Sequence, residues 1–307
     1  MKILVTGGAG FIGSHVVDQL IKANIETYVL VSGFRSSKHP SIINQEAHVI
    51  QGDLRAFNTL EYATRHIDLV MHLGAVLSHY MERDPELTLD VNIKGTWHLK
   101  KACAQNKVNK IIFASSSFIY GEPKLNPVNE DHPTNPKDIL GITKLAGEKI
   151  LQSTHPNFIP YTILRIFNVY GPRQYSDVLY TAAIPTMIDH ALKHESIEIH
   201  DDGKQSLDFT YVEDVAEAFL KCVDQKSQNQ IFNVASGIAT SVNQLALLIN
   251  KITKNPTPSH YNPNHPMYLK LVQADINKLH TLTGWTPRTT LSEGLEKTVA
   301  FFKGEHL

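Results

Sequence analysis

Three glycines at a predicted strand-to-helix turn have the spacing of a phosphate-binding loop. The segment "KILVTGGAGFIGSH" places Gly7, Gly10 and Gly13 between an apolar, β-rich run and an amphipathic helical pattern. The first glycine permits a tight turn, the second lets the backbone approach a pyrophosphate, and the third allows close helix–strand packing. The N–H groups at the helix start would face the phosphates. This context favours dinucleotide binding over a purely structural turn.

The elements that must position this turn alternate along the first two-thirds of the chain. Strand-like runs rich in Val, Ile and Leu are followed by helical patterns, among them residues 11–23 and 85–105. This alternation predicts a parallel sheet covered by helices on both faces. The strand-like runs occupy residues 2–6, 27–31, 47–53, 68–75, 110–117 and 161–169.

The texture changes after Gly171, where Gly and Pro separate shorter elements. Helical patterns return at residues 212–223, 242–252 and 291–302. We therefore expect residues 1–171 to form a dinucleotide-binding domain, to which later segments can return. Residues 172–307 are expected to form mainly a substrate-binding α+β region, with the ligand between the two parts.

The composition is that of an ordinary globular protein, with 42% hydrophobic and 19% charged residues in 307. The 29 Lys and Arg residues balance 30 Asp and Glu residues, so charge favours neither a nucleic-acid nor an anionic-membrane partner. No apolar run reaches the length of a membrane span. Cys103 and Cys222 indicate buried thiols of a reducing compartment. A cytoplasmic protein is expected.

The ordered motifs of the chain resemble those of one enzyme family. The sequence is similar to the extended short-chain dehydrogenase/reductases, in their NAD-dependent epimerase/dehydratase branch, which acts on nucleotide sugars. The resemblance runs nearly end to end. It rests on "TGGAGFIGSH" (6–15), "GDL" (52–54), "HLGA" (72–75), "VNIKGT" (91–96), "FASSSFIYGEP" (113–123), "TKLAGEK" (143–149), "LRIFNVYGPRQ" (164–174), "DFTYVEDVAEA" (208–218), "FNVAS" (232–236) and "TGWTPRTTLSEGL" (283–295).

The resemblance implies a Rossmann-type, doubly wound parallel sheet with a smaller C-terminal substrate-binding region. It also implies that Asp53 meets the adenine amino group and that Asn92 fixes the nicotinamide side. The residues expected to contact the cofactor are Gly7, Gly10, Phe11, Ile12, Gly13, Ser32, Arg35, Asp53, Leu54, Leu73, Ala75, Asn92, Lys144 and Phe167.

The choice between NAD and NADP depends on the end of the second predicted strand. An acidic residue about twenty positions past the glycines would bind the ribose diol of NAD. Val31 and Ser32 stand there instead, and Arg35 together with Ser32, Ser36 and Lys38 could bind the 2′-phosphate of NADP. Alternatively, Arg35 is merely solvated beside the adenine. We lean toward NADP, and NAD stays open.

The family oxidises sugars with a Ser or Thr, a Tyr and a Lys, the last two spaced Tyr-x-x-x-Lys on one helix face. The Lys holds the nicotinamide ribose and lowers the Tyr pKa, so that a phenolate can accept a hydroxyl proton. By resemblance Ser116 and Lys144 match the Ser and the Lys, whereas Leu140 stands at the Tyr position. Substitute bases are sought in His79, Tyr80 and Tyr120.

The residues after Ser116 limit which reactions of the family are expected. Family dehydratases place Asp-Glu there, and decarboxylases also carry the Glu, whereas this chain has Ser117 and Phe118. Both reactions are therefore disfavoured. What remains is oxidation at a ring carbon, by a 4-epimerase or a 4-keto-forming dehydrogenase. The alternative is a catalytically silent NAD(P)-binding protein with a regulatory or scaffolding role.

Substrate recognition also departs from the family pattern. Two arginines that bind the diphosphate in nucleotide-sugar members are replaced by Leu207 and His265. A nucleotide sugar is still expected, with another carrier or a smaller polyol left open. The residues expected to bind the substrate are Ser116, Ser117, Asn168, Arg173, Lys204 and His265, and Lys270 is a further candidate to compensate.

Two further expectations concern metals and assembly. His190 and His194 have an i, i+4 spacing that can bind a metal, but no third ligand is apparent, so we expect a solvated helix face and no metal. The resemblance implies a homodimer formed through the predicted helices at residues 85–105 and 141–153.

Overall fold

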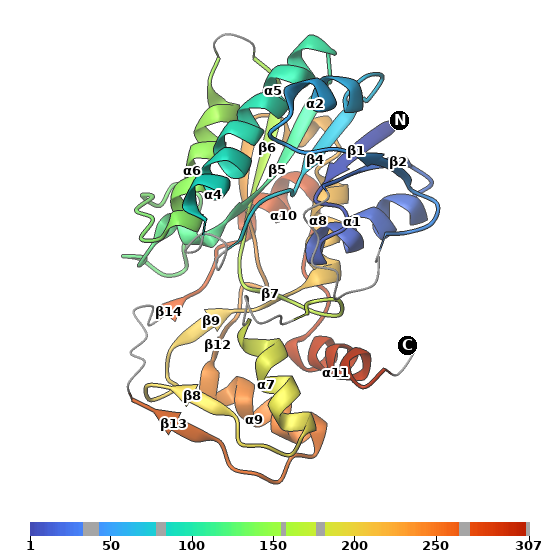
Figure 1. Cartoon of the computed structure of the whole chain (residues 1–307). Helices are drawn as coiled ribbons and strands as arrows, with labels where there is room; N and C mark the ends of the chain where they lie inside the picture. The colour runs from blue at the N-terminus through green and yellow to red at the C-terminus, as the bar shows by residue number, and fades with distance from the viewer. Residues whose placement is uncertain (33–42, 78–83, 155–157, 176–181, 264–270, 305–307) are drawn as a thin grey trace.

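The computed structural model describes residues 1–32, 43–77, 84–154, 158–175, 182–263 and 271–304. A central sheet with helices on both faces forms the larger part, and a smaller group of helices and short strands lies below it (Figure 1). Among the described residues no helix has the length and apolar character needed to cross a membrane.

The central sheet contains seven strands, and every neighbouring pair is parallel. All six predicted strands lie in it, and the predicted doubly wound fold class is confirmed. The seventh strand comes from late in the chain and was not predicted as a strand. In spatial order the strands are β11 (Gln230–Val234), β6 (Tyr161–Ile166), β5 (Lys110–Ser116), β4 (Leu69–His72), β1 (Lys2–Thr6), β2 (Glu26–Val31) and β3 (His48–Gln51).

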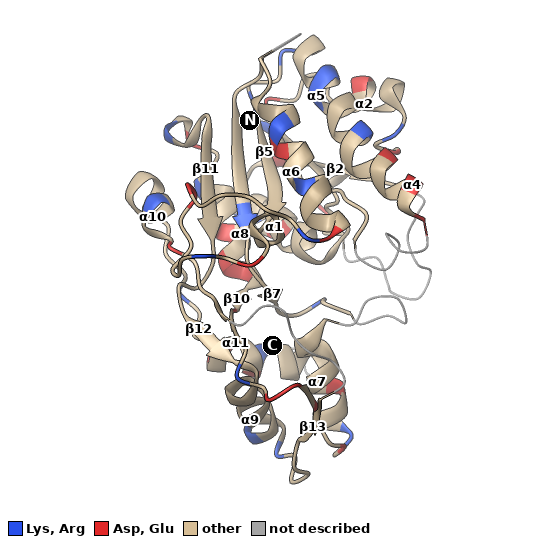
Figure 2. Ribbon diagram, turned by 90° about the vertical axis from the view of Figure 1, so that its left-hand side faces the viewer, with Lys and Arg blue, Asp and Glu red and all other residues tan. Residues whose placement is uncertain are grey.

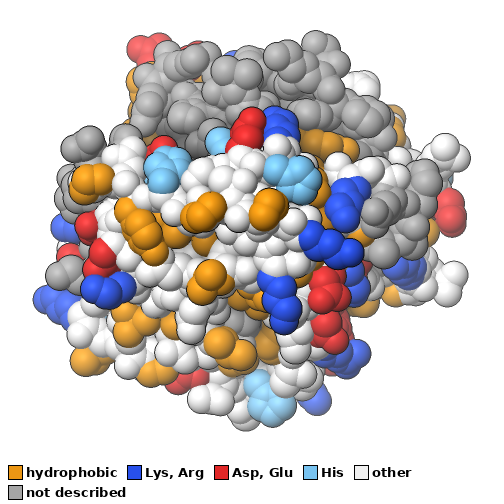
Figure 3. Space-filling model, turned by 90° about the horizontal axis from the view of Figure 1, so that it is seen from below, with side chains coloured by type: hydrophobic (Ala, Val, Ile, Leu, Met, Phe, Trp, Pro, Cys, Tyr) orange, Lys and Arg blue, Asp and Glu red, His pale blue; other side chains and the backbone are white. Residues whose placement is uncertain are grey.

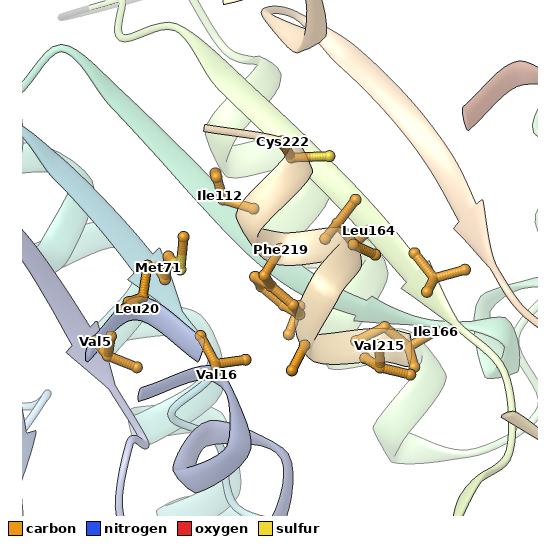
Figure 4. Packing of buried hydrophobic residues seen from close by; sticks show 14 of the residues in the cluster. Val5, Val16, Leu20, Met71, Ile112, Leu164, Ile166, Val215, Phe219 and Cys222 are labelled. Atoms are coloured by element: carbon orange, nitrogen blue, oxygen red, sulfur yellow. The ribbon is translucent and has the colours of Figure 1, made fainter. Parts of the chain in front are cut away.

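Alternate residues of the strands enter two cores, because successive side chains of a strand point to opposite faces of the sheet. Ile3 and Val5 of β1 belong to one core, and Leu4 belongs to the other. Figure 4 shows the first core, where Phe219 packs among Ile112, Leu164 and neighbouring side chains. Burial on both faces explains why the strands are nearly continuous apolar runs.

Helices from distant parts of the chain cover each face. On one face α1 (Phe11–Lys22) packs beside α8 (Val212–Lys221), with α10 (Asn277–Thr283) against β11. The other face carries α2 (Phe57–Ala63), α5 (Gly95–Gln105) and α6 (Ile139–Gln152). The predicted helix at 85–105 is α4 (Pro85–Leu89), a π-helical turn at Asp90–Lys94, and α5 in succession.

The smaller region surrounds a core of its own. It contains α7 (Ala183–Leu192), α9 (Val242–Thr253), α11 (Leu291–Phe302), the pair β8 (Glu198–His200) and β13 (His260–Asn262), and the sheet of β12 (Ala239–Ser241), β9 (Ser206–Asp208) and β14 (Leu271–Val272). The pair β7 (Val169–Tyr170) and β10 (Thr210–Tyr211) lies between it and the central sheet (Figure 2).

Charges of both signs are interspersed along the helices (Figure 2), in keeping with a formal net charge of −1. Seen from below, hydrophobic side chains lie among polar and charged ones in small groups (Figure 3). The two cysteines, Cys103 and Cys222, are buried and unpaired, as predicted.

Candidate active site

The glycine turn follows β1 directly and opens α1. Gly7 has a φ of 72°, a left-handed conformation that favours glycine, and its carbonyl accepts a hydrogen bond from Gly10 N at 2.9 Å. A side chain at Gly13 would collide with the Gly7 carbonyl oxygen, whereas a Cβ at Gly10 would meet only that oxygen, at 3.2 Å. Gly10 therefore borders open space at the start of the helix.

The start of α1 has the properties of an anion site. No side chain caps it, and the first N–H groups of a helix have no partner within it. These N–H groups and the positive end of the helix dipole suit a pyrophosphate. Phe11 and Ile12, the first two residues of α1, are partly buried here. The turn thus fits the dinucleotide that the sequence predicted.

The adenine-side candidates lie at the ends of β2 and β3. Ser32 is exposed just after β2, and Arg35 lies outside the described residues. Asp53 is bound by Arg55, whose guanidinium approaches the carboxylate to 2.6 Å. Hydrogen bonds from Arg55 lower the pKa of Asp53. Leu54 is buried beside Gly74 and Gly95.

The π-helical turn at Asp90–Lys94 places Asn92 in the interior. Asn92 Oδ1 accepts a hydrogen bond from Val76 N at 2.7 Å, and its Nδ2 donates to Val76 O at 3.0 Å. The same Nδ2 donates to Thr143 Oγ1 on α6 at 3.2 Å. Single π turns inside helices are frequent at functional sites. This turn joins the segment after β4, which holds Leu73 and Ala75, to the helix that carries Lys144.

Lys144 projects from α6 to the end of β5. The side chain is buried, and Nζ donates a hydrogen bond to Ala114 O at 2.7 Å. Nζ also lies 5.1 Å from the centre of the Phe113 ring. Burial lowers the pKa of Lys144 to about 8. An ammonium has three donors, and this one donates a single hydrogen bond within the described residues, which leaves two donors for the hydroxyl groups of a ligand such as the ribose of a dinucleotide.

Ser116 and Leu140 lie on the two elements that the Lys144 hydrogen bond joins, β5 and α6. Ser116 ends β5, two residues beyond Ala114, and its Oγ accepts a hydrogen bond from Phe118 N at 3.3 Å. Leu140 precedes Lys144 by four residues, on the same face of α6. A Cβ at Gly141 would lie 2.6 Å from the Phe118 carbonyl oxygen, so the first turn of α6 touches the segment after Ser116. Ser117 is buried, and the Phe118 side chain is 41% exposed.

Tyr120 does not fit the role of substitute base. Its side chain is 1% exposed, and its hydroxyl donates to Asn233 Oδ1 at 2.7 Å while accepting from Arg165. Burial raises the pKa of Tyr120 to about 12. We therefore withdraw Tyr120 as a base. The other two candidates, His79 and Tyr80, lie outside the described residues.

The predicted substrate contacts are not all brought together. Asn168 Nδ2 donates to Asp208 O at 3.1 Å. Arg173 pairs with Asp18 of α1 at 2.7 Å, and Lys204 is exposed in a turn where it pairs with Asp202 at 2.9 Å. The structure thus engages both cations in ion pairs. His265 and Lys270 lie outside the described residues, while Phe167 is fully buried after β6.

Comparison with known proteins decides the family. The family described as "NAD dependent epimerase/dehydratase family" matches residues 3–235. The chain belongs to this family. The family, the fold class and the enzymatic nature that the sequence predicted are therefore confirmed.

Several known proteins are similar to this member of the epimerase/dehydratase family over nearly its whole length. A putative UDP-glucose 4-epimerase of Methanocaldococcus jannaschii is 35% identical over 308 residues, which cover 99% of each chain. The UDP-glucose 4-epimerase of Thermotoga maritima, solved with UDP-glucose, has a TM-score of 0.92 at 33% identity and covers 99% of both chains. The UDP-glucuronic acid 4-epimerase of Bacillus cereus, solved with UDP-glucuronic acid and NAD, has a TM-score of 0.88 at 32% identity and full coverage of both.

The interpretation of His190 and His194 as neighbours on one helix is wrong. In this family member α7 ends at Leu192, and His194 has a φ of 57°, outside the helix. His190 Nδ1 lies 3.5 Å from Glu195 Oε2 instead. Within the described residues, no three His, Cys, Asp or Glu side chains are grouped as metal ligands.

Sequence reasoning missed a buried ion pair behind the site. Glu148 lies one turn after Lys144 on α6 and pairs with Arg165 of β6. Ser115 Oγ donates to Glu148 at 2.5 Å, and Arg165 donates to the Tyr120 hydroxyl at 3.0 Å. The signal was a charged residue on the lysine face of the helix, but its partner on a strand could not be inferred from spacing.

Proposed function

We propose that this chain is an NAD-dependent 4-epimerase of a nucleotide-linked sugar. The carrying observation is the pairing of an uncapped glycine turn with a buried lysine that retains two hydrogen-bond donors at the end of β5. The names of the relatives, which include epimerases of UDP-glucose and UDP-glucuronic acid, support a nucleotide-linked sugar as the substrate and C4 as the reacting carbon. A dehydrogenase that releases a 4-keto sugar is the neighbouring alternative.

The residues of the site would divide the work as follows. Bound NAD supplies the group that accepts and returns a hydride. Gly7, Gly10 and Gly13 accommodate the pyrophosphate, and Asn92 keeps the segment after β4 in place on the nicotinamide side. Lys144 would donate hydrogen bonds to the ribose hydroxyls. Its positive charge would favour the deprotonated form of a nearby substrate hydroxyl.

Ser116 would bind the hydroxyl that is oxidised. Its Oγ already accepts one hydrogen bond from Phe118 N, so its own proton can be donated to the sugar oxygen. Leu140 adds an apolar surface beside Lys144, where the family pattern has a phenol, so the proton that the hydroxyl loses would pass to solvent water. Removing a positioned acid or base typically slows turnover by about 10²–10⁴-fold, so we expect a slow enzyme.

Dehydration and decarboxylation are less well supported, although both occur among the relatives. Human dTDP-D-glucose 4,6-dehydratase is 31% identical, and a UDP-N-acetyl-alpha-D-glucosaminuronate decarboxylase of Bacillus cytotoxicus is 29% identical. Both reactions need an acid–base group beyond the hydride transfer, and in the family pattern a carboxylate stands where this chain has Phe118. A phenyl ring cannot exchange a proton.

The cofactor choice is open to a direct titration. NAD is present in the solved Bacillus cereus relative, while the absence of a carboxylate at Ser32 removes one obstacle to the 2′-phosphate of NADP. We propose NAD as the resident cofactor. Tighter binding of NADP than of NAD, measured by calorimetry, would reverse that assignment.

A homodimer is part of the proposal. Three large apolar side chains are exposed on or beside the helices that the family analogy indicates: Leu89 of α4 (43%), Trp97 of α5 (36%) and Ile142 of α6 (48%). These helices pack side by side (Figure 1). Burying them against a second copy would remove apolar area from water. A monomeric mass in sedimentation-equilibrium ultracentrifugation would contradict the dimer.

The test of the function uses purified protein with NAD and a panel of UDP-glucose, UDP-N-acetylglucosamine and UDP-glucuronic acid. We expect sugar NMR to show conversion of one of them to its C4 epimer, without net accumulation of NADH. Accumulation of NADH with a 4-keto product would indicate the dehydrogenase. Binding of NAD with no turnover and no sugar binding would leave the catalytically silent protein, which the aliphatic Leu140 favours.

A further inference from the structure

His72 ends β4 and has no part in the chemistry described above, yet it joins two segments of the site. The side chain is 1% exposed. Its Nδ1 lies 2.7 Å from Thr6 Oγ1 at the end of β1, and its Nε2 lies 3.0 Å from Thr96 Oγ1 on α5. Thr6 and Thr96 are equally buried, at 1% exposure each.

The directions of these hydrogen bonds follow from the protons available. Thr96 donates its one hydroxyl proton to Asn92 O at 2.6 Å, so it can only accept from His72. Thr6 Oγ1 accepts from Gly74 N at 3.1 Å, which leaves its proton for His72 Nδ1. A neutral imidazole with its proton on Nε2 therefore satisfies every donor once.

The surroundings favour the uncharged ring. Burial lowers the pKa of His72 to about 3, and the positive charge of Lys144 acts in the same direction. The Phe113 ring is near both side chains, with its centre 5.4 Å from that of His72 and 5.1 Å from Lys144 Nζ. The imidazole thus stays neutral while the ammonium is charged.

Each end of this hydrogen-bond chain supports a part of the dinucleotide site. At one end, Gly74 lies against the glycine turn, since a Cβ on Gly7 would come within 2.6 Å of Gly74 N. At the other end, the chain ends on Asn92 of the π turn, whose side chain holds Val76. A change in the middle would shift both ends.

We propose that His72 is a positioning residue that fixes the glycine turn relative to the π turn and so sets the affinity for the dinucleotide. This inference rests on the proposed function. It predicts that a change at Thr96, which is not part of the glycine turn, weakens cofactor binding.

The first experiment tests the hydrogen-bond chain without any ligand. Long-range ¹H–¹⁵N spectra of histidine-labelled protein, with His72 assigned by the His72→Asn variant, report the ring tautomer. We expect a neutral ring protonated on Nε2 at neutral pH. A ring protonated on Nδ1, or a charged ring, would overturn the inference.

The second experiment measures the NAD dissociation constant by calorimetry. Thr96→Val removes both roles of the hydroxyl, and we expect about tenfold weaker binding, whereas Thr96→Ser keeps the hydroxyl and should bind within about twofold of wild type. The matched control is Thr298→Val on α11, because Thr298 is fully buried and donates to Gly294 O at 2.6 Å.

A purely structural role would lower the melting temperature of both valine variants and leave NAD affinity unchanged. Equal affinities for wild type, Thr96→Val and Thr298→Val would therefore overturn this inference alone. Failure of the wild-type protein to bind NAD would overturn the proposed function and this inference together, so the two failures are distinguishable.

Discussion

Arg165 binds Glu148 through two parallel hydrogen bonds, from Nε at 3.1 Å and from an Nη at 2.9 Å, with both side chains almost fully buried. This pair fixes α6 to β6 one turn beyond Lys144. The carboxylate raises the pKa of Arg165 although burial alone would lower it. This buried ion pair thus helps to hold the helix that carries the lysine.

Replacing this carboxylate should destabilise the protein strongly. Glu148→Gln leaves the Arg165 charge buried without its partner, and breaking a buried pair in this way costs about 3–5 kcal/mol. The control is Glu217→Gln, because Glu217 lies 3.5 Å from an Arg288 that is 71% exposed, and such pairs contribute about 1 kcal/mol or less. Urea unfolding measures both. Similar losses for the two variants would contradict the role of the buried pair.

Two substitutions in the glycine turn should affect cofactor binding and protein stability separately. Gly10→Ala meets only the Gly7 oxygen, at 3.2 Å, so we expect nearly unchanged stability but NAD binding weakened by about tenfold or more, since the methyl group would stand where the pyrophosphate approaches. Gly13→Ala should destabilise the fold, because its methyl group would overlap the Gly7 carbonyl. Melting curves and calorimetric titration test the pair. Unimpaired NAD binding by Gly10→Ala would contradict the proposed role of the glycine turn in binding the pyrophosphate.

The sequence predicted the features that depend on local spacing. The six early strands follow from apolar runs, and the glycine turn follows from three residues within seven positions. Other features depend on tertiary contacts. β11 is a short run between turns, and nothing local shows that it pairs with β6. The bond between Thr6 and His72 joins residues 66 positions apart, and the Glu148–Arg165 pair joins a helix to a strand.

The site was predicted least well where long side chains form ion pairs and hydrogen bonds with other side chains. The sequence predicted that Arg173 and Lys204 bind the substrate, but each pairs with an acidic residue that spacing could not assign. Tyr120 similarly looked available until the fold placed it against Arg165 and Asn233. Ion pairs and burial are properties of the packed chain, so these assignments required the structure.

Lys144 should destabilise the ligand-free protein at neutral pH. Its folded-state pKa of about 8 lies below the ordinary value of 10.5, so the unfolded chain binds the proton more tightly and stability rises with pH between these values. We expect Lys144→Met to be more stable than wild type by about 1–3 kcal/mol at pH 7, with the difference shrinking by pH 10. Lys149→Met, on the exposed side of α6, is the control. A pH-independent difference in urea unfolding would contradict this prediction.

Ser116 should affect turnover and not cofactor affinity. Ser116→Ala removes the hydrogen-bond donor that we propose for the reacting oxygen, and we expect kcat to fall by about 10²-fold with an unchanged NAD dissociation constant. Ser116→Thr retains the hydroxyl and should keep most of the activity. Initial rates by sugar NMR and a parallel NAD titration measure both. An alanine variant as active as wild type would remove Ser116 from the chemistry.

The central claim is that a sugar hydroxyl reacts beside Lys144 and Ser116, where Leu140 supplies no proton acceptor. Leu140→Tyr adds a phenol on the lysine face of α6, and Leu140→Phe adds the same ring without the hydroxyl. The most direct measurement is therefore the epimerisation rate of the two variants, followed by sugar NMR with saturating NAD. We predict that Leu140→Tyr reaches or exceeds the wild-type rate and surpasses Leu140→Phe by about 10²-fold or more. Equal, strongly reduced rates for both variants would contradict the account.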